Sequence, residues 1–132
     1  MRVWKQLYLI VWLAFLQIII ILLPGFEGTL VDLHVLIGLA ILGLAHYDNA
    51  KLKKTSAPTR LKRIAKSTAV LATFQIILGL ILYANVRFNV NVPLVDVVTF
   101  LHLVVALAII SQASSVATAY DMWEEHEYNA KT

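Results

Sequence analysis

Four long stretches of apolar residues, separated by short polar segments, constrain the fold of this chain more than any other feature. They cover residues 7–23, 30–47, 68–86 and 94–119 and carry very few charged side chains. A helix that crosses the roughly 30 Å hydrocarbon core of a bilayer needs about 20 mostly apolar residues. Because backbone polar groups in lipid must bond to one another, we expect each stretch to form a transmembrane helix.

The composition favours a membrane protein over a soluble helical bundle. Hydrophobic residues make up 60% of the chain and charged residues 14%, whereas about a quarter of an ordinary soluble domain is charged. The first stretch is too long for the core of a signal peptide and lacks a small-residue cleavage site. We therefore predict an all-α membrane protein whose residues 1–132 form a single domain. The sequence contains no cysteine, which excludes disulfides and thiolate sites.

The distribution of Lys and Arg predicts the orientation in the cell membrane. The 24–30 and 87–95 loops together hold only Arg87. By the positive-inside rule, both chain ends, the basic loop 48–66 and the acidic tail 120–132 lie in the cytoplasm. Short loops then give a multi-pass, up-down-up-down four-helix bundle. The basic loop also suits anionic lipid head groups, although we favour its role as a topology signal over lipid or nucleic-acid binding. Its cations are Lys51, Lys53, Lys54, Arg60, Lys62, Arg63 and Lys66.

Two histidines inside the apolar stretches are the main candidates for a functional site, because ionisable groups in spans are rare and often functional. His34 and His102 lie near the outer ends of the second and fourth stretches. At about 1.5 Å per residue, both imidazoles should sit roughly 6–9 Å below the outer surface. The second and fourth helices of a bundle can be diagonal partners, so the two side chains can clamp one haem iron from both sides.

Small residues accompany these histidines at helical spacing. Gly38 follows His34 by one turn, Ala106 follows His102 by one turn, and the third stretch carries Gln75 and Gly79. Small side chains beside the ligands leave room for a flat macrocycle. The same residues also allow membrane helices to pack closely, and histidine can hydrogen-bond between helices.

The other histidines do not suggest a second haem. His46 lies about 18 Å below His34 and about 120° around the helix. A second haem at His46 would need another ligand on the fourth stretch at the same depth. The residue there is Ser114, which is a poor ligand. We therefore expect His46 at the membrane interface and His126 in solvent, and predict one haem of undetermined type (B, O or A).

Charged groups gather at the outer side. Asp32 points about 200° away from His34, so we expect it to cap its helix or, alternatively, to serve a proton path. Glu27 and Asp32 are the only carboxylates that we consider as catalytic groups. Arg87 is the only cation on this side and could pair with a haem propionate.

The order of these motifs resembles one half of heme A synthase. The shared pattern is an outer histidine, a basic loop, Q-x-x-L-G on the third helix (Gln75–Gly79) and H-L on the fourth (His102-Leu103). The resemblance extends over residues 7–119. It implies a four-helix bundle that holds haem between histidines on its second and fourth helices. Some compact archaeal members have a single bundle, which implies assembly as homo-oligomers.

The chain departs from the catalytic half of that family. Val31 and Val35 occupy the positions of a glutamate and an arginine, and the outer cysteine pair is absent. The resemblance therefore implies the cofactor-holding half, and an oxidoreductase acting on haem would have to use Asp32 or Glu27 instead.

Three functions remain open from the sequence. The first is a haem-binding membrane protein of the heme A synthase type. The second is a small b-type cytochrome that takes electrons from a quinol. The third is a haem-free accessory subunit of a larger membrane complex, in which the histidines only pack between helices.

Overall fold

The computed structural model describes residues 2–130, which form four long helices and no strands. Helix α1 spans Val3–Leu22, α2 spans Thr29–Lys53, α3 spans Thr59–Phe88 and α4 spans Val95–Asn129. All four are long and apolar enough to cross a membrane. The prediction of an all-α protein with four membrane-spanning helices is therefore confirmed.

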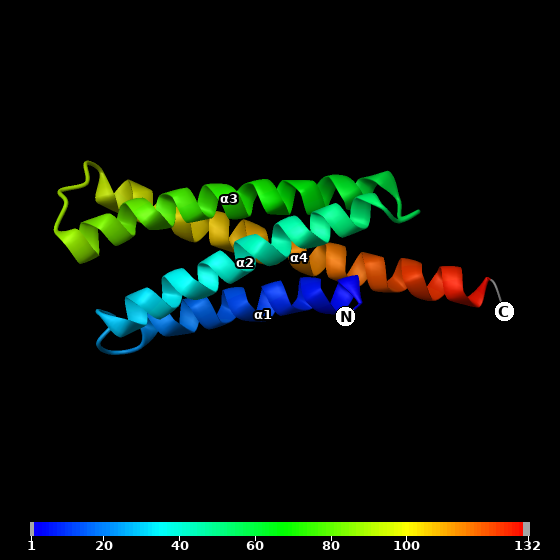
Figure 1. The fold of residues 1–132 in the computed structure, drawn as a ribbon, viewed down its shortest axis with the longest axis horizontal. Helices are drawn as coiled ribbons and strands as arrows, with labels where there is room; N and C mark the ends of the chain where they lie inside the picture. Colours follow the sequence, from blue (N-terminus) through cyan, green and yellow to red (C-terminus); the bar gives the residue numbers. More distant parts are fainter. Residues whose placement is uncertain (1, 131–132) are drawn as a thin grey trace.

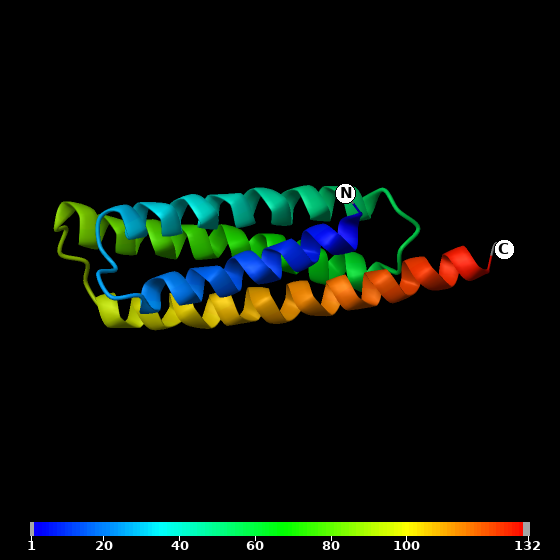
Figure 2. The ribbon, with the colours of Figure 1, turned by 90° about the horizontal axis from the view of Figure 1, so that it is seen from below.

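The helices pack as a four-cornered bundle. Helix α1 contacts α2 and α4, and α3 contacts α2 and α4. Among the described residues, no Cα atom of α2 comes within 8 Å of α4, so these two helices are diagonal partners, as expected. Figures 1 and 2 show that successive helices run in opposite directions along the bundle, so that α2 and α4 run the same way. We call the end that holds the start of α1 the inner end and the opposite end the outer end.

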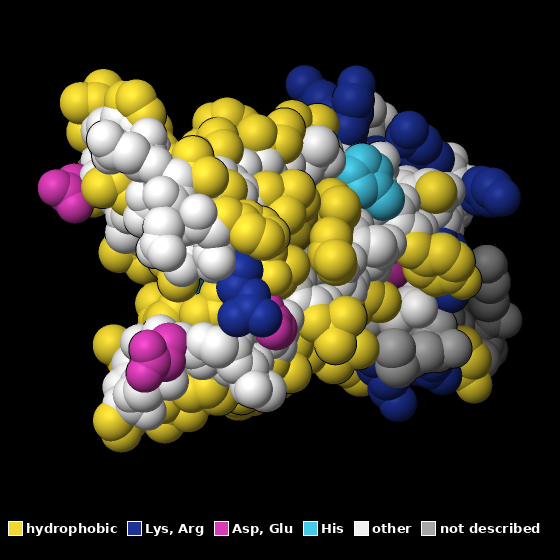
Figure 3. All heavy atoms as spheres, turned by 60° about the vertical axis from the view of Figure 1, so that its left-hand side comes forward, with side chains coloured by type: hydrophobic (Ala, Val, Ile, Leu, Met, Phe, Trp, Pro, Cys, Tyr) yellow, Lys and Arg dark blue, Asp and Glu magenta, His cyan; other side chains and the backbone are white. Residues whose placement is uncertain are grey.

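The core is closest packed towards the inner end. Alanines fill much of it, including Ala45, Ala69, Ala113 and Ala117, all at most 3% exposed. Small side chains allow helix backbones to approach closely in a membrane, where van der Waals contact drives association. Towards the outer end few residues are buried, and Figure 3 shows a hollow between the helices there. This difference in packing leaves space for a site at the outer end.

The outside of the bundle is apolar between its two ends. Trp12, Leu36 and Phe100 are each more than 60% exposed. In Figure 3 hydrophobic side chains cover the middle of the molecule, while most Lys and Arg gather at the inner end. Such a continuous apolar surface would be a liability in water but suits contact with lipid. The chain is a multi-pass membrane protein.

The helices extend beyond the apolar stretches. The basic segment 48–66, expected as a loop, is mostly helical, and only residues 54–58 connect α2 to α3. In the same way α4 continues to Asn129 through most of the acidic tail. Lys, Arg, Leu and Ala all favour helix, so the helical hydrogen bonds continue past the point where hydrophobicity ends. Residues 131–132 of the tail lie outside the described residues.

Candidate functional site

His34 on α2 and His102 on α4 meet in the bundle interior. Their ring centroids are 6.2 Å apart, and the ring planes are inclined at 49°. The two imidazoles approach each other across the diagonal of the bundle, between helices whose backbones do not touch. The sequence placed both side chains at a similar depth on diagonal helices, and the structure brings them together.

The histidines line a partly open cavity of about 480 Å³ to which all four helices contribute. Its volume lies within the range of about 300–1,000 Å³ that is usual for ligand pockets. Most of the lining is apolar, and the polar groups are concentrated near the two histidines. Gly38, Gln75, Gly79 and Ala106, which the sequence analysis singled out, all contribute to the wall.

All four helices contribute polar side chains to this cavity wall, among them Gln17 from α1, His34 from α2, Gln75 from α3 and His102 from α4. The Nε2 atom of Gln17 donates a hydrogen bond of 2.8 Å to the backbone carbonyl of His34. Four buried polar atoms in this group have no hydrogen-bond partner among the described residues. They are Nδ1 of His34, Nδ1 of His102, and the Oε1 atoms of Gln17 and Gln75. Such unpaired groups are unusual inside proteins, and here they belong to the two imidazoles and to the two glutamines of the same cavity wall.

Two glycines set the width of the cavity. A Cβ atom on Gly79 would lie 3.1 Å from Cε1 and 4.0 Å from Nε2 of His102. One on Gly38 would lie 3.3 Å from Nε2 of Gln17 and from Cδ1 of Ile76. The 3.1 Å distance at Gly79 and the 3.3 Å distances at Gly38 are shorter than ordinary van der Waals contact. Any larger residue at Gly79 would therefore press directly against the His102 ring.

The aromatic ring of Phe26 closes one side of the site. Phe26 lies in the connection between α1 and α2, and its ring meets His34 edge to face, with the centroids 5.7 Å apart. Phe26 also lines the cavity, so the outer loop forms part of its wall.

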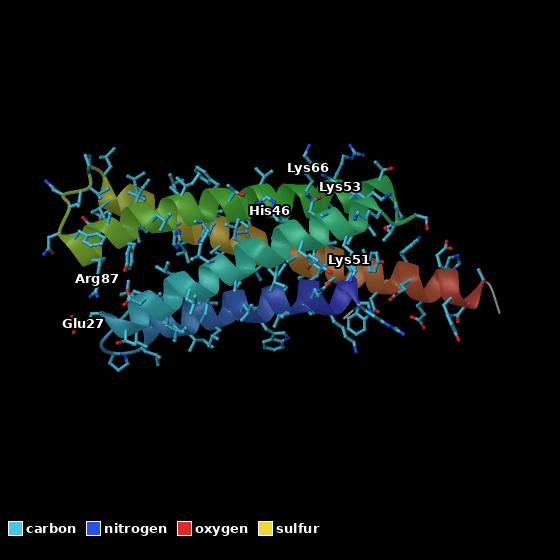
Figure 4. All side chains as sticks on the ribbon, in the orientation of Figure 1. Glu27, His46, Lys51, Lys53, Lys66 and Arg87 are labelled. Carbon is cyan, nitrogen blue, oxygen red and sulfur yellow. The ribbon has the colours of Figure 1, made fainter. Side chains whose placement is uncertain are left out.

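A polar bridge joins α2 to α3 at the outer end. The hydroxyl of Tyr83 donates a hydrogen bond of 3.0 Å to Oδ1 of Asp32, and Nη2 of Arg87 lies 3.9 Å from Oδ2 of Asp32. Figure 4 shows Arg87 extending from α3 towards α2. Asp32 lies in the first turn of α2, where its negative charge favours the helix N-terminus as expected, although α2 has no side-chain capping hydrogen bond. The carboxylate also faces across to α3.

Neither carboxylate that was considered for catalysis lines the cavity. Asp32 is occupied by the bridge, and its side chain is about half exposed. Glu27 is exposed in the outer loop and is labelled at the outer end in Figure 4. Of the bridging residues, only Tyr83 contributes to the cavity wall.

The other histidines lie elsewhere. Nε2 of His46 is 2.9 Å from Oγ1 of Thr73, which ties α2 to α3 on the exposed side. His126 is exposed near the end of α4. Neither lines the cavity, so both can serve as controls for His34 and His102.

The sequence analysis missed Gln17, Phe26 and Tyr83. Gln17 had a recognisable signal, since it is the only polar residue in the apolar stretch 7–23 apart from Tyr8. A buried polar side chain in a membrane helix usually has a specific partner. Phe26 and Tyr83 carried no such signal, because aromatic residues are common at the ends of membrane helices.

The donor set does not suit a bare metal ion. Among the described residues, no group of three or more His, Asp or Glu side chains is placed to hold one. Two imidazoles could complete the coordination of a metal ion whose other ligands come from a non-protein group.

Comparison with protein-family models, curated proteins and solved structures finds no match to this chain.

Proposed function

We propose that this membrane protein binds one haem between His34 and His102. The observation that carries the proposal is the pair of imidazoles 6.2 Å apart in a cavity to which all four helices contribute. A bond from a metal ion to an imidazole nitrogen is about 2 Å long, and the ring centroid lies roughly 1 Å beyond that nitrogen. Two imidazoles on opposite sides of one metal ion therefore have centroids about 6 Å apart.

The cavity wall also fits a flat macrocycle. A porphyrin supplies four ligands to its iron, so a protein needs to add only the two axial ones. The absence of a side chain at Gly79 lets the His102 ring lie close to the α3 backbone, because a Cβ there would lie 3.1 Å from Cε1 and 3.8 Å from Nδ1 of the ring. The apolar residues that make up most of the wall suit the faces of the ring.

The unpaired polar atoms fit the needs of metal-bound imidazoles. A histidine that binds metal through one ring nitrogen carries a proton on the other, and this N–H needs an acceptor. The unpaired Nδ1 atoms of His34 and His102 share the cavity with two unpaired acceptors, Oε1 of Gln17 and Oε1 of Gln75. Small side-chain rotations would allow the glutamines to hold the two rings in place.

Electron transfer is the role that the arrangement favours. If His34 and His102 both held the iron, they would leave no place on it for substrate or oxygen, and the chemistry that the haem would supply is electron transfer. Neither Asp32 nor Glu27 lines the cavity, so no carboxylate is placed to assist hydroxylation of haem. The protein then acts as a small b-type cytochrome or as a haem-holding half related to heme A synthase. Haem supplies the redox chemistry, and the chain supplies binding, orientation and exclusion of water.

In this proposal the inner end of the bundle lies in the cytoplasm. Most Lys and Arg side chains lie at that end (Figure 3), as the positive-inside rule requires. The histidine pair then lies towards the outer surface and is suited to exchanging electrons with a partner on that side.

A titration of the purified, haem-free protein in detergent with hemin tests the proposal. We expect saturation at one hemin per chain and at least a tenfold loss of affinity in His34→Ala and in His102→Ala. His46→Ala and His126→Ala are the matched controls and should bind like the original chain. Equal binding by all four variants, or no saturable binding by the original chain, would contradict the proposal.

A second experiment separates the two haem-related roles. The protein is co-expressed with an enzyme that makes haem O, and the bound haem is extracted and identified. Conversion of haem O to haem A would establish an oxidoreductase acting on haem. Unchanged haem, together with reduction of the bound haem by a quinol, would establish an electron-transfer protein.

A further inference from the structure

A second, shallower cavity of about 370 Å³ lies between α3 and α4 near the inner end. It is lined by Arg60, Arg63, Ile64, Ser67 and Gln112. The first four belong to α3, and Arg60, Arg63 and Ser67 recur at helical spacing and so share one face. All three of these side chains are exposed. We call this cavity the basic groove.

The polar groups that face the basic groove are hydrogen-bond donors. A guanidinium group can only donate, and the Ser67 hydroxyl can donate to a ligand. The Oε1 atom of Gln112 already accepts a hydrogen bond of 3.2 Å from the hydroxyl of Thr68, which is only 2% exposed. The hydroxyl of Thr68 also donates to the backbone carbonyl of Ile64 at 3.0 Å, so its contact with Gln112 does not fix which end of the amide faces the groove; the NH₂ group is the donor that Gln112 offers to an anion. Such a set of donors fits an anion.

The positive charge of the groove is not compensated. Among the described residues, neither Arg60 nor Arg63 takes part in an ion pair. No acidic residue occurs in residues 51–66, which carry seven Lys and Arg side chains. Two neighbouring guanidinium groups can bind a phosphate through several parallel hydrogen bonds.

Below the basic groove the same face of α3 becomes apolar. Val70, Phe74 and Ile77 continue the spacing of Arg63 and Ser67, and their side chains are 58%, 44% and 51% exposed. A phosphate group held by the arginines would therefore stand at the head of an exposed apolar stripe on a membrane helix. This combination matches a phospholipid, whose charged head group is joined to acyl chains.

We infer that the basic groove binds the phosphate of an anionic phospholipid, with the acyl chains along Val70, Phe74 and Ile77. Arg60 and Arg63 contact the phosphate, and Ser67 and Gln112 add hydrogen bonds. The inference does not depend on the haem site, because the groove and the cavity at His34 share no lining residue. General attraction of cations to an acidic membrane surface would not single out these two arginines.

The test measures lipid binding to the purified full-length protein in neutral detergent. Short-chain phosphatidylglycerol, short-chain phosphatidylcholine and inorganic phosphate are each added, and the thermal unfolding midpoint is recorded against concentration. We expect phosphatidylglycerol to raise the midpoint in a saturable way and the other two to have little effect. The double variant Arg60→Gln, Arg63→Gln should weaken the apparent affinity for phosphatidylglycerol at least fivefold.

The control is the double variant Lys53→Gln, Lys54→Gln, which removes the same charge outside the basic groove. It should retain the affinity of the original chain, whereas Ser67→Asp, which puts a carboxylate into the groove, should abolish saturable binding. Equal losses in both double variants would overturn the inference in favour of diffuse charge attraction. Equal stabilisation by inorganic phosphate would overturn the lipid assignment in favour of a soluble phosphate. Unchanged binding in Arg60→Gln, Arg63→Gln would also overturn it.

Discussion

The imidazoles of His34 and His102 lie with their centroids 6.2 Å apart, although the helices that carry them make no backbone contact in the described part of the chain. Each side chain reaches towards the bundle axis from an opposite corner. A ligand between them would therefore bridge the diagonal α2 and α4. Such a ligand would add contacts in the outer half of the bundle, where few side chains are buried.

Substitution of Gly79 tests the space beside His102. In Gly79→Ala the new methyl group would lie 3.1 Å from Cε1 of His102, so the ring must shift or tilt. Changes to groups that support metal ligands typically weaken metal binding by about 10–100-fold, and we expect hemin affinity to fall by about tenfold. The affinity is measured by absorbance titration in detergent.

Gly43→Ala is the matched control for this change. It lies in the same bundle on α2, and a Cβ atom there would have no heavy atom within 4 Å. It should bind hemin normally and gain slightly in stability, by up to about 1 kcal/mol, because alanine favours helix. Normal hemin binding by Gly79→Ala would argue against a ligand beside His102.

The bridge from Asp32 to Arg87 predicts opposite effects for its two members. Arg87→Ala removes a cation that could bind a haem carboxylate, whereas Asp32→Asn releases Arg87 from its present partner. Because both side chains are about half exposed, each effect should be less than about 1 kcal/mol, or within fivefold in hemin affinity. Affinity should fall in Arg87→Ala and rise in Asp32→Asn. Effects of the same sign would show that Arg87 does not bind the haem carboxylates.

The hydrogen bond from Gln17 to the His34 carbonyl predicts a coupled loss of stability and binding. Gln17→Leu removes this 2.8 Å bond and the acceptor next to His34, so we expect a loss of about 1 kcal/mol in unfolding free energy and weaker hemin binding. The control is Thr73→Val, which removes the contact with His46 outside the cavity. Thr73→Val should reduce stability without changing the hemin titration. If Gln17→Leu behaved in the same way, Gln17 would be a packing residue only.

Removal of the buried carboxylate of Asp48, at the inner end, should raise the stability of the protein. Asp48 is 1% exposed, and neither of its carboxylate oxygens has a hydrogen-bond partner among the described residues. Desolvating an ionised carboxylate costs free energy that an uncharged amide of the same shape does not incur. Asp48→Asn should therefore raise the thermal unfolding midpoint, while Glu125→Gln in the exposed end of α4 should leave it unchanged. A lower midpoint in Asp48→Asn would show that the carboxylate itself is needed there.

The sequence was sufficient to predict the four helices and the diagonal placement of α2 and α4 in the bundle. Four apolar stretches leave little choice of fold, and short connections leave few ways to arrange the helices. His34, Gly38, Gln75 and Gly79, which the sequence analysis named from their helical spacing, line the same cavity. The helix ends were less predictable. Hydrophobicity indicates only the part of a helix that crosses the membrane, whereas residues 48–53 and 59–66 are polar segments that still favour helix.

Contacts between helices escaped the sequence analysis. The place of Asp32 in the first turn of α2 was expected, but its contacts with Tyr83 and Arg87 depend on the crossing of α2 and α3. Phe26 reaches His34 only through the fold of the loop that begins with Pro24-Gly25. Such contacts depend on helix rotation and tilt, which a single sequence does not specify.

The most direct test of haem binding between His34 and His102 is the haem content of the protein purified from haem-producing cells. A pyridine haemochrome assay gives the number of haems per chain, and a reduced-minus-oxidised spectrum shows whether the iron has two strong axial ligands. We expect one haem per chain and a sharp low-spin spectrum, both lost on changing His34 or His102. A protein that carries no haem, while a control cytochrome from the same cells is fully loaded, would contradict the proposed function.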